Sequence, residues 1–256
     1  MINQIRADFY RQAHTFGIVL LAAITAVYAA LVCGFEAPGG IMVNGPMSML
    51  DKLAAKDWTL YDGLHGGALS SSVLVYFFIA LFVIVIGSEF SQRIYKNTLV
   101  SGISRLGFVL GKYVVMLIDI LVGMIWYYVI VLLTGVIAGR TMGTSIGRLA
   151  SFTATTLLVT TFFVSVVFSL ALVLLIVTKS LVLSAVFIVV WPLGISLLSI
   201  AIKWHWLTYF DFFNVASGIS FNMLSTADTW RCVWVSVAVL IGSILVASTI
   251  IKRQEL

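Results

Sequence analysis

The sequence predicts an all-α integral membrane protein, and three observations carry this prediction. Hydrophobic residues make up 61% of the 256 residues and charged residues only 10%, whereas a soluble domain carries about 25% charged residues. The apolar residues gather in uncharged runs long enough to cross a bilayer, which takes roughly 20 residues of helix. None of these runs alternates strictly between polar and apolar residues, so they predict helices rather than the strands of a barrel.

Six such runs predict six transmembrane helices within a single domain of residues 1–256. The expected spans cover about residues 15–35, 69–87, 113–139, 151–178, 180–202 and 230–251. We interpret the first run as a retained anchor, because it is too long for the apolar part of a signal peptide. An even number of spans places both termini on one side, and the distribution of lysine and arginine favours the cytoplasmic side.

The net charge of +5 does not predict a nucleic-acid partner. The basic residues are scattered among short loops instead of gathering on one face, as expected for cationic loops held at the cytoplasmic side of a membrane. The two cysteines, Cys33 and Cys232, form neither a disulfide framework nor a metal-ligand pattern. We expect buried thiols, and the spacing leaves open whether the two cysteines pair.

The N-terminal stretch, residues 1–14, has the periodicity of a short amphipathic helix. Ile2, Ile5, Phe9 and Ala13 repeat at helical spacing. This pattern favours a helix lying in the cytoplasmic membrane interface before the first span. The alternative is a simple cytoplasmic extension of that span.

Two segments between the spans are expected on the outer face. In residues 36–68, Met47, Leu50, Ala54 and Trp58 predict a short amphipathic helix, which would contact a substrate or pack on the ends of the spans. Residues 203–224 are rich in aromatic side chains, which favour the headgroup region. We interpret this second segment as a re-entrant or interfacial pair of short helices broken near Gly218, or else as an aromatic belt that only anchors the chain. Its candidate residues are Trp204, Trp206, Tyr209, Asp211 and Gly218.

Two residues inside the predicted spans are unusual. Pro192 is the only proline within a span and predicts a kink in the fifth helix. Asp119 is the only acidic residue within a span, and an intramembrane carboxylate is a functional candidate by default. We favour a structural role, in which Asp119 reaches interfacial water or pairs with a nearby arginine or lysine. A proton-carrying role in a secondary transporter is the alternative.

The charged segment between the second and third spans contains Gly107-x-x-x-Gly111-Lys112, which is close to a phosphate-binding loop. A true loop of that kind has four residues between the glycines and a hydroxyl residue after the lysine, and here Tyr113 stands in that place. We therefore expect Gly107 and Gly111 to form a face of small residues for close helix packing. The histidines are isolated and no metal-ligand motif occurs, so we expect no catalytic residues, no metal and no enzyme activity on this chain.

The same segment has the pattern of two helices joined by a turn. Residues 89–100 have helical character, Ser101 and Gly102 interrupt it, and Ser104 can cap a second helix that continues into the third span. The result is a basic elbow exposed to the cytoplasm. It would contact lipid headgroups or serve as a docking site for a cytoplasmic partner.

This elbow resembles that of the type-2 ABC exporter permeases, the ABC-2 type. In that family an acid at the end of the second span precedes a basic residue and Asn, a Leu, a Gly-x-Ser-Arg turn and a later Lys. The matching residues here are Glu89, Lys96, Asn97, Leu99, Gly102, Ser104, Arg105 and Lys112. The N-terminal helix, the six spans and the outer segment before the sixth span fit the same architecture. The sequence Gln92-Arg93-Ile94 departs from the Gly-Thr of many members.

The resemblance implies a permease subunit that pairs with a second permease, as a homodimer or a heterodimer, and with cytoplasmic ATPase subunits. ATP and Mg would bind the ATPase, with no cofactor on this chain. The coupling elbow would comprise Glu89, Arg93, Lys96, Asn97, Leu99, Gly102, Ser104, Arg105 and Lys112.

The resemblance also implies a bacterial cytoplasmic membrane and a substrate class. The chain is similar to small permeases of lantibiotic and bacteriocin immunity, bacitracin resistance and phenol-soluble modulin export, so the expected substrates are amphipathic or antimicrobial peptides. The alternatives are export of another hydrophobic compound, or a non-transport scaffold or sensor that recruits a cytoplasmic protein.

Overall fold

A computed structural model describes residues 2–40, 45–55, 57–91 and 102–253. Within these ranges the chain is all-helical, without a strand. Six helices are long and apolar enough to cross a membrane, which confirms the predicted number of spans.

The chain begins with two helices that meet at a sharp corner. Helix α1 covers Ile2–Ala13 and helix α2, the first span, covers Phe16–Gly34. The hydroxyl of Thr15 donates to the carbonyl oxygen of Arg11 at 2.7 Å, and the Thr15 N–H donates to the Gln12 carbonyl oxygen at 2.9 Å. These bonds satisfy backbone groups that the end of α1 would otherwise leave open.

A short helix, α3 (Met47–Ala54), precedes the second span. It confirms the predicted helix in this loop, but it ends before Trp58. The indole of Trp58 is nevertheless buried, and its Nε1 donates to the Leu53 carbonyl oxygen at 2.8 Å. The segment between α2 and α4 is therefore folded back on itself around this side chain.

The second span starts earlier than the apolar run predicts. Thr59 and Asp62 form a reciprocal capping box, so helix already begins at Leu60, where the sequence still contains polar residues. The span then passes through α4 (Leu60–Ser70), the 3-10 turn η1 (Ser71–Val73), α5 (Leu74–Phe82), the π-helical turn η2 (Val83–Gly87) and α6 (Ser88–Ser91).

The third and fourth spans are the two longest helices of the described chain. They are α8 (Arg105–Ile137) and α9 (Ile146–Thr178), with 33 residues each. Ser104 caps α8 by accepting from the Gly107 N–H at 3.1 Å, as the sequence predicts. At about 1.5 Å per residue each helix is roughly 50 Å long, so both extend beyond the bilayer core.

The last part of the chain contains α10 (Leu181–Ile202), the 3-10 helix η3 (His205–Phe210), α11 (Phe212–Ser220) and α12 (Thr226–Arg253). Helix α10 continues past Pro192. The predicted break near Gly218 is wrong, because the two short helices separate at Asp211, whose carboxylate caps α11 by accepting from the Asn214 N–H at 3.3 Å. Gly218 instead allows close packing, since a Cβ there would lie 3.0 Å from Leu224.

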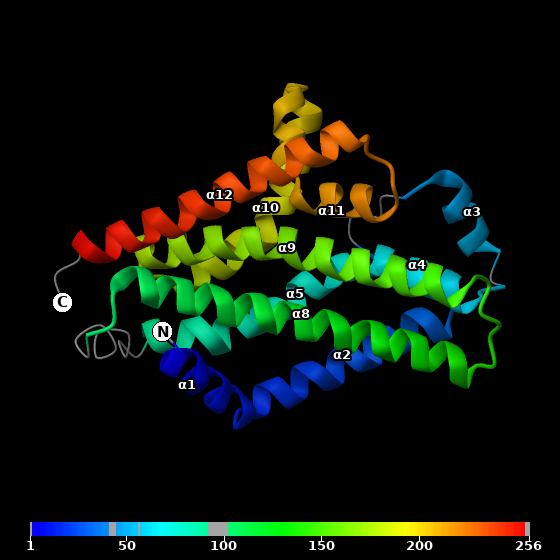
Figure 1. Ribbon diagram of the computed structural model, residues 1–256, viewed down its shortest axis with the longest axis horizontal. Coiled ribbons are helices and arrows are strands. Elements are labelled where there is room, and N and C mark those ends of the chain that lie inside the picture. The colour runs from blue at the N-terminus through cyan, green and yellow to red at the C-terminus, as the bar shows by residue number, and fades with distance from the viewer. Residues whose placement is uncertain (1, 41–44, 56, 92–101, 254–256) are drawn as a thin grey trace.

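Figure 1 shows how these helices are arranged. Helix α9 crosses the middle of the bundle, with α8 on one side and α12 with α11 on the other. Helix α1 and the C-terminal part of α12 lie at one end, and α3 lies at the opposite end. The largest fully buried side chains include Phe78, Tyr127, Tyr128, Phe163 and Phe212, which fill the interior around α8 and α9.

Candidate functional site

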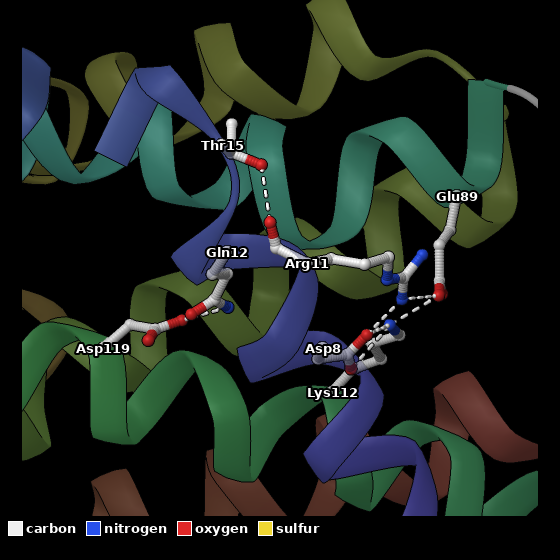
Figure 2. Close-up of polar contacts among 7 residues, drawn as sticks. All are labelled: Asp8, Arg11, Gln12, Thr15, Glu89, Lys112 and Asp119. Carbon is white, nitrogen blue, oxygen red and sulfur yellow. Dashed lines mark hydrogen bonds and ion pairs between the residues drawn. The ribbon is translucent and has the colours of Figure 1, made fainter. Parts of the chain in front are cut away.

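Four charged side chains meet inside the bundle at the end that holds α1. Asp8 and Arg11 come from α1, Glu89 from α6 and Lys112 from α8 (Figure 2). The Lys112 Nζ lies 2.9 and 2.8 Å from the two carboxylate oxygens of Asp8, and 2.6 Å from Glu89 Oε2. We call these four residues the ionic cluster.

Arg11 completes the ionic cluster from its solvent side. Its Nη2 donates to Asp8 Oδ1 and to Glu89 Oε1, and 44% of its side chain is exposed. Partial burial acts to lower the pKa of Arg11, but the hydrogen bonds and negative charges of Glu89 and Asp8 outweigh it and raise the pKa above its ordinary value. Arg11 therefore remains a cation and covers the buried charges.

The charges within the cluster balance, which makes their burial tolerable. Lys112 has no exposed surface, and Asp8 and Glu89 are almost completely buried. A buried charge costs several kcal/mol unless it is paired, and here two carboxylates face two cations. The ammonium group of Lys112 also lies 5.8 Å from the centroid of the Phe108 ring.

Helix α1 reaches the cluster with a polar stripe and not with its apolar face. Gln4, Asp8 and Gln12 lie four residues apart and are the buried residues of α1. Gly111 of α8 allows this contact, since a Cβ there would lie 3.1 Å from Gln4 Oε1. Of the two glycines predicted to form a small face, only Gly111 meets another helix, because a Cβ at Gly107 would meet the side chain of Ser104.

This stripe differs from the face that the apolar residues of α1 predict. Ile5 and Phe9 do pack partly against the core, but Ile2 is 67% exposed. The signal that could have found the stripe is the spacing of Gln4, Asp8 and Gln12, which repeats every four residues and marks one helical face.

Among the described residues Asp119 forms no ion pair, so the pairing with arginine or lysine, one of its two expected structural roles, is not found there. Its Oδ2 accepts a hydrogen bond from Gln12 Nε2 at 2.9 Å (Figure 2). The two nearby cations, Arg11 and Lys112, are already bound to the carboxylates of the ionic cluster. The partner of Asp119 is therefore a neutral side chain, Gln12, on the same polar stripe of α1.

The residues of the predicted coupling elbow fall into three groups. Glu89 and Lys112 are buried in the ionic cluster, so their expected exposure is wrong. Gly102 adopts a positive φ of 92°, which suits glycine at the turn. The Nε of the half-buried Arg105 has no hydrogen-bond partner among the described residues. Ser104, beside them, caps α8, and the other four residues, Arg93, Lys96, Asn97 and Leu99, lie outside the described part of the chain.

The aromatic segment before α12 forms a second polar site. Trp204 and Trp206 are about half exposed and stack with ring centroids 5.6 Å apart. The buried Asp211 accepts hydrogen bonds from Ser196 Oγ at 2.7 Å and from Asn214 Nδ2 at 2.6 Å. A cavity of about 390 Å³ lies beside it, lined among others by Tyr209, Asp211 and Gly218.

The end of the bundle near α3 contains ion pairs that the sequence analysis did not predict. Arg140 lies 2.9 Å from Glu36 and donates to the Cys33 carbonyl oxygen at 2.7 Å. Lys52 lies 2.6 Å from the helix-capping Asp62. These contacts tie the loops after α2 and α8 to the start of α4.

Cys33 and Cys232 are both buried free thiols, as expected, and they do not form a disulfide. Within the described ranges, no three His, Cys, Asp or Glu side chains are grouped so that they could hold a metal ion.

Comparisons with protein-family models, with curated proteins and with solved structures find no match to this chain.

Proposed function

We propose that this chain is the transmembrane permease subunit of an ATP-driven exporter of the type-2 ABC class. It pairs with a second permease subunit in a bacterial cytoplasmic membrane, with both termini in the cytoplasm and α1 in the membrane interface. ATP and Mg bind separate ATPase subunits, so this chain is not itself an enzyme. The six apolar helices and the elbow pattern around Gly102, Ser104 and Arg105 support this proposal.

The ionic cluster is the observation that carries the proposal. Glu89 and Lys112 stand on either side of the predicted elbow, and they contact Arg11 and Asp8 of α1. A force applied to the elbow by an ATPase would reach α1 and α8 through buried charge pairs, which are costly to separate. Coupling of this kind also requires that the ATPase binds one conformation of the permease more tightly than another.

We propose amphipathic or antimicrobial peptides as the exported compounds, for toxin export or self-immunity. This substrate class rests on the family resemblance. The stacked, exposed rings of Trp204 and Trp206 give it further support, because such rings suit the boundary between apolar and polar groups. In this proposal η3 and α11 form the outer interfacial segment.

Association with an ATPase tests the proposal. The chain is purified from its native membrane in mild detergent, a co-purifying ATPase is identified, and peptide-stimulated ATP hydrolysis is measured. Arg105→Glu should release the ATPase, because it reverses the charge at the predicted docking surface. Arg148→Glu is the matched control, since Arg148 is an exposed arginine in the first turn of α9, a helix that begins far from the elbow.

The same experiment separates the exporter from a scaffold or sensor. An exporter should hydrolyse ATP faster when an amphipathic peptide is added, and the Arg105→Glu complex should not. A chain that binds a cytoplasmic protein without ATPase activity would contradict the exporter proposal.

A further inference from the structure

A groove opens on the membrane-facing side of the bundle between α2, α5 and α8. Its volume is about 280 Å³, and Gln12 of α1 lies at its edge. The walls are mostly apolar and include Leu21, Phe78, Val122 and Trp126. The Trp126 Nε1 donates to the Ala22 carbonyl oxygen at 3.0 Å, which fixes the position of the indole against α2.

Asp119 is the only ionisable side chain among the residues that line this groove. Its hydrogen-bond partner is the neutral amide of Gln12 at 2.9 Å. The ionic cluster nearby has no spare cation, because Arg11 and Lys112 are balanced by its own two carboxylates. Within the described chain, the carboxylate of Asp119 therefore lies at an apolar groove without a counter-ion.

The dimensions of the groove suit one narrow ligand. Asp119 and Trp126 are seven positions apart on α8, which corresponds to about 10 Å along the helix. Binding pockets for small molecules commonly measure about 300–1,000 Å³, so this groove lies at the lower end and fits a single chain better than a two-chain phospholipid. Gly123 brings Phe78 close to α8, since a Cβ at that position would lie 2.7 Å from its ring.

We infer that this groove binds a single-chain amphiphile that carries a protonated amine. The protonated amine donates to the carboxylate of Asp119 and to the amide oxygen of Gln12, while the apolar chain lies along Val122 toward Trp126. A carboxylate at membrane depth is expected to have a functional partner, and a cationic amphiphile supplies both the missing charge and the apolar part. We identify this ligand with the cargo, as the amine-bearing stretch of an amphipathic peptide. This identification rests on the proposed function.

A proton-carrying Asp119 would explain the carboxylate but not the apolar groove beside it. Protonation needs only access to water, whereas the walls formed by Phe78, Val122 and Trp126 favour an apolar chain. The two explanations differ in one measurable property: only a ligand site discriminates between amphiphiles with different head groups.

Direct binding of dodecylamine tests the inference. The purified chain is placed in nanodiscs of phosphatidylcholine, and binding of radiolabelled dodecylamine is measured by scintillation proximity, with dodecanol as the neutral probe of equal chain length. Dodecylamine should bind saturably. Asp119→Asn keeps a hydrogen-bonding group opposite Gln12 but removes the charge, and should weaken dodecylamine binding about tenfold, which corresponds to about 1.4 kcal/mol. Dodecanol binding should not change.

Two further variants test whether weakened probe binding arises in the groove or elsewhere in the protein. Val122→Trp fills the groove from an exposed position without changing any charge, and should weaken the binding of both probes. Asp228→Asn removes the charge of a partly exposed acid near the start of α12 and should change neither. Size-exclusion chromatography and far-UV circular dichroism verify that each variant is folded.

Equal dodecylamine affinity in Asp119→Asn and the native chain would overturn the inference. Loss of dodecylamine binding in nanodiscs of phosphatidylethanolamine would also overturn it, because a two-chain lipid amine would then occupy the groove. Since the assay needs no ATPase, a negative result leaves the exporter proposal standing, and failure to find an ATPase leaves the binding result standing.

Discussion

The ammonium group of Lys112 lies between Asp8 and Glu89 and has no exposed surface. Replacing it by methionine would preserve much of the apolar stem but leave two buried carboxylates facing only Arg11. Breaking a buried ion pair in this way typically costs about 3–5 kcal/mol. We expect Lys112→Met to lower the free energy of unfolding by this amount, measured by chemical unfolding in detergent.

The control for this prediction is Lys252→Met, which removes an exposed lysine near the end of α12. It should change the free energy of unfolding by less than about 0.5 kcal/mol. A double variant, Asp8→Leu with Lys112→Met, should recover part of the loss, because it removes one uncompensated carboxylate together with the cation. Additive losses in the double variant would contradict direct pairing of Asp8 with Lys112.

Asp211 provides a second prediction at the residue scale. It caps α11 and accepts hydrogen bonds from Ser196 and Asn214. Asp211→Ala should destabilise the protein by about 1–2 kcal/mol, through the lost cap and the unpaired donors. Asp51→Ala removes an exposed acid of α3 and should cost less. Equal effects of the two substitutions on the unfolding midpoint would contradict the capping role.

At the scale of single elements, the contact between α1 and α8 depends on Gly111. A leucine at this position would collide with Gln4, since even a Cβ would lie 3.1 Å from Gln4 Oε1. We expect Gly111→Leu to release α1 from α8 and to speed amide hydrogen exchange in residues 2–13. Gly147→Leu is the control, because a Cβ there meets no atom within 4 Å. Unchanged exchange in Gly111→Leu would contradict the docking of α1.

The elements differ in how far the sequence predicts them. The six spans follow from long apolar runs, and the cap at Ser104 follows from a local hydrogen bond, so both could be read from neighbouring residues. The pairing of Asp8 with Lys112 joins positions 104 residues apart. The packing of α1 on α8 likewise joins segments that are distant in the sequence. Local periodicity carries no information on such pairs. The apolar residues of α1 predict an apolar buried face, whereas the buried residues of this helix are polar.

The start of the second span and the surroundings of Asp119 differ in how far the sequence predicts them. The capping box of Thr59 and Asp62 extends helix into a polar stretch that a search for apolar runs leaves out. For Asp119, the sequence identifies the unusual carboxylate, but its partner Gln12 depends on how α1 packs. The capping box is a local signal that neighbouring residues carry, whereas the partner of Asp119 requires knowledge of which helices touch.

At the scale of the whole molecule, the described beginning and end of the chain lie at the same end of the bundle (Figure 1). We expect both ends on the cytoplasmic side. Single cysteines placed at positions 3 and 252, in a chain whose native cysteines are replaced by alanine, should resist a membrane-impermeant maleimide in right-side-out vesicles. A cysteine at position 148 should react. Labelling of position 3 or 252 in intact vesicles would contradict the proposed orientation.

The central claim is that the ionic cluster transmits motion from a cytoplasmic ATPase to the permease. The most direct test is ATP-dependent uptake of a fluorescent amphipathic peptide into inside-out vesicles that contain the permease and its ATPase, with ATP hydrolysis measured in the same sample. Asp8→Asn weakens the link between α1 and Lys112 and should leave hydrolysis largely intact while transport per ATP falls severalfold. Unchanged transport per ATP in the Asp8→Asn variant would contradict the claim.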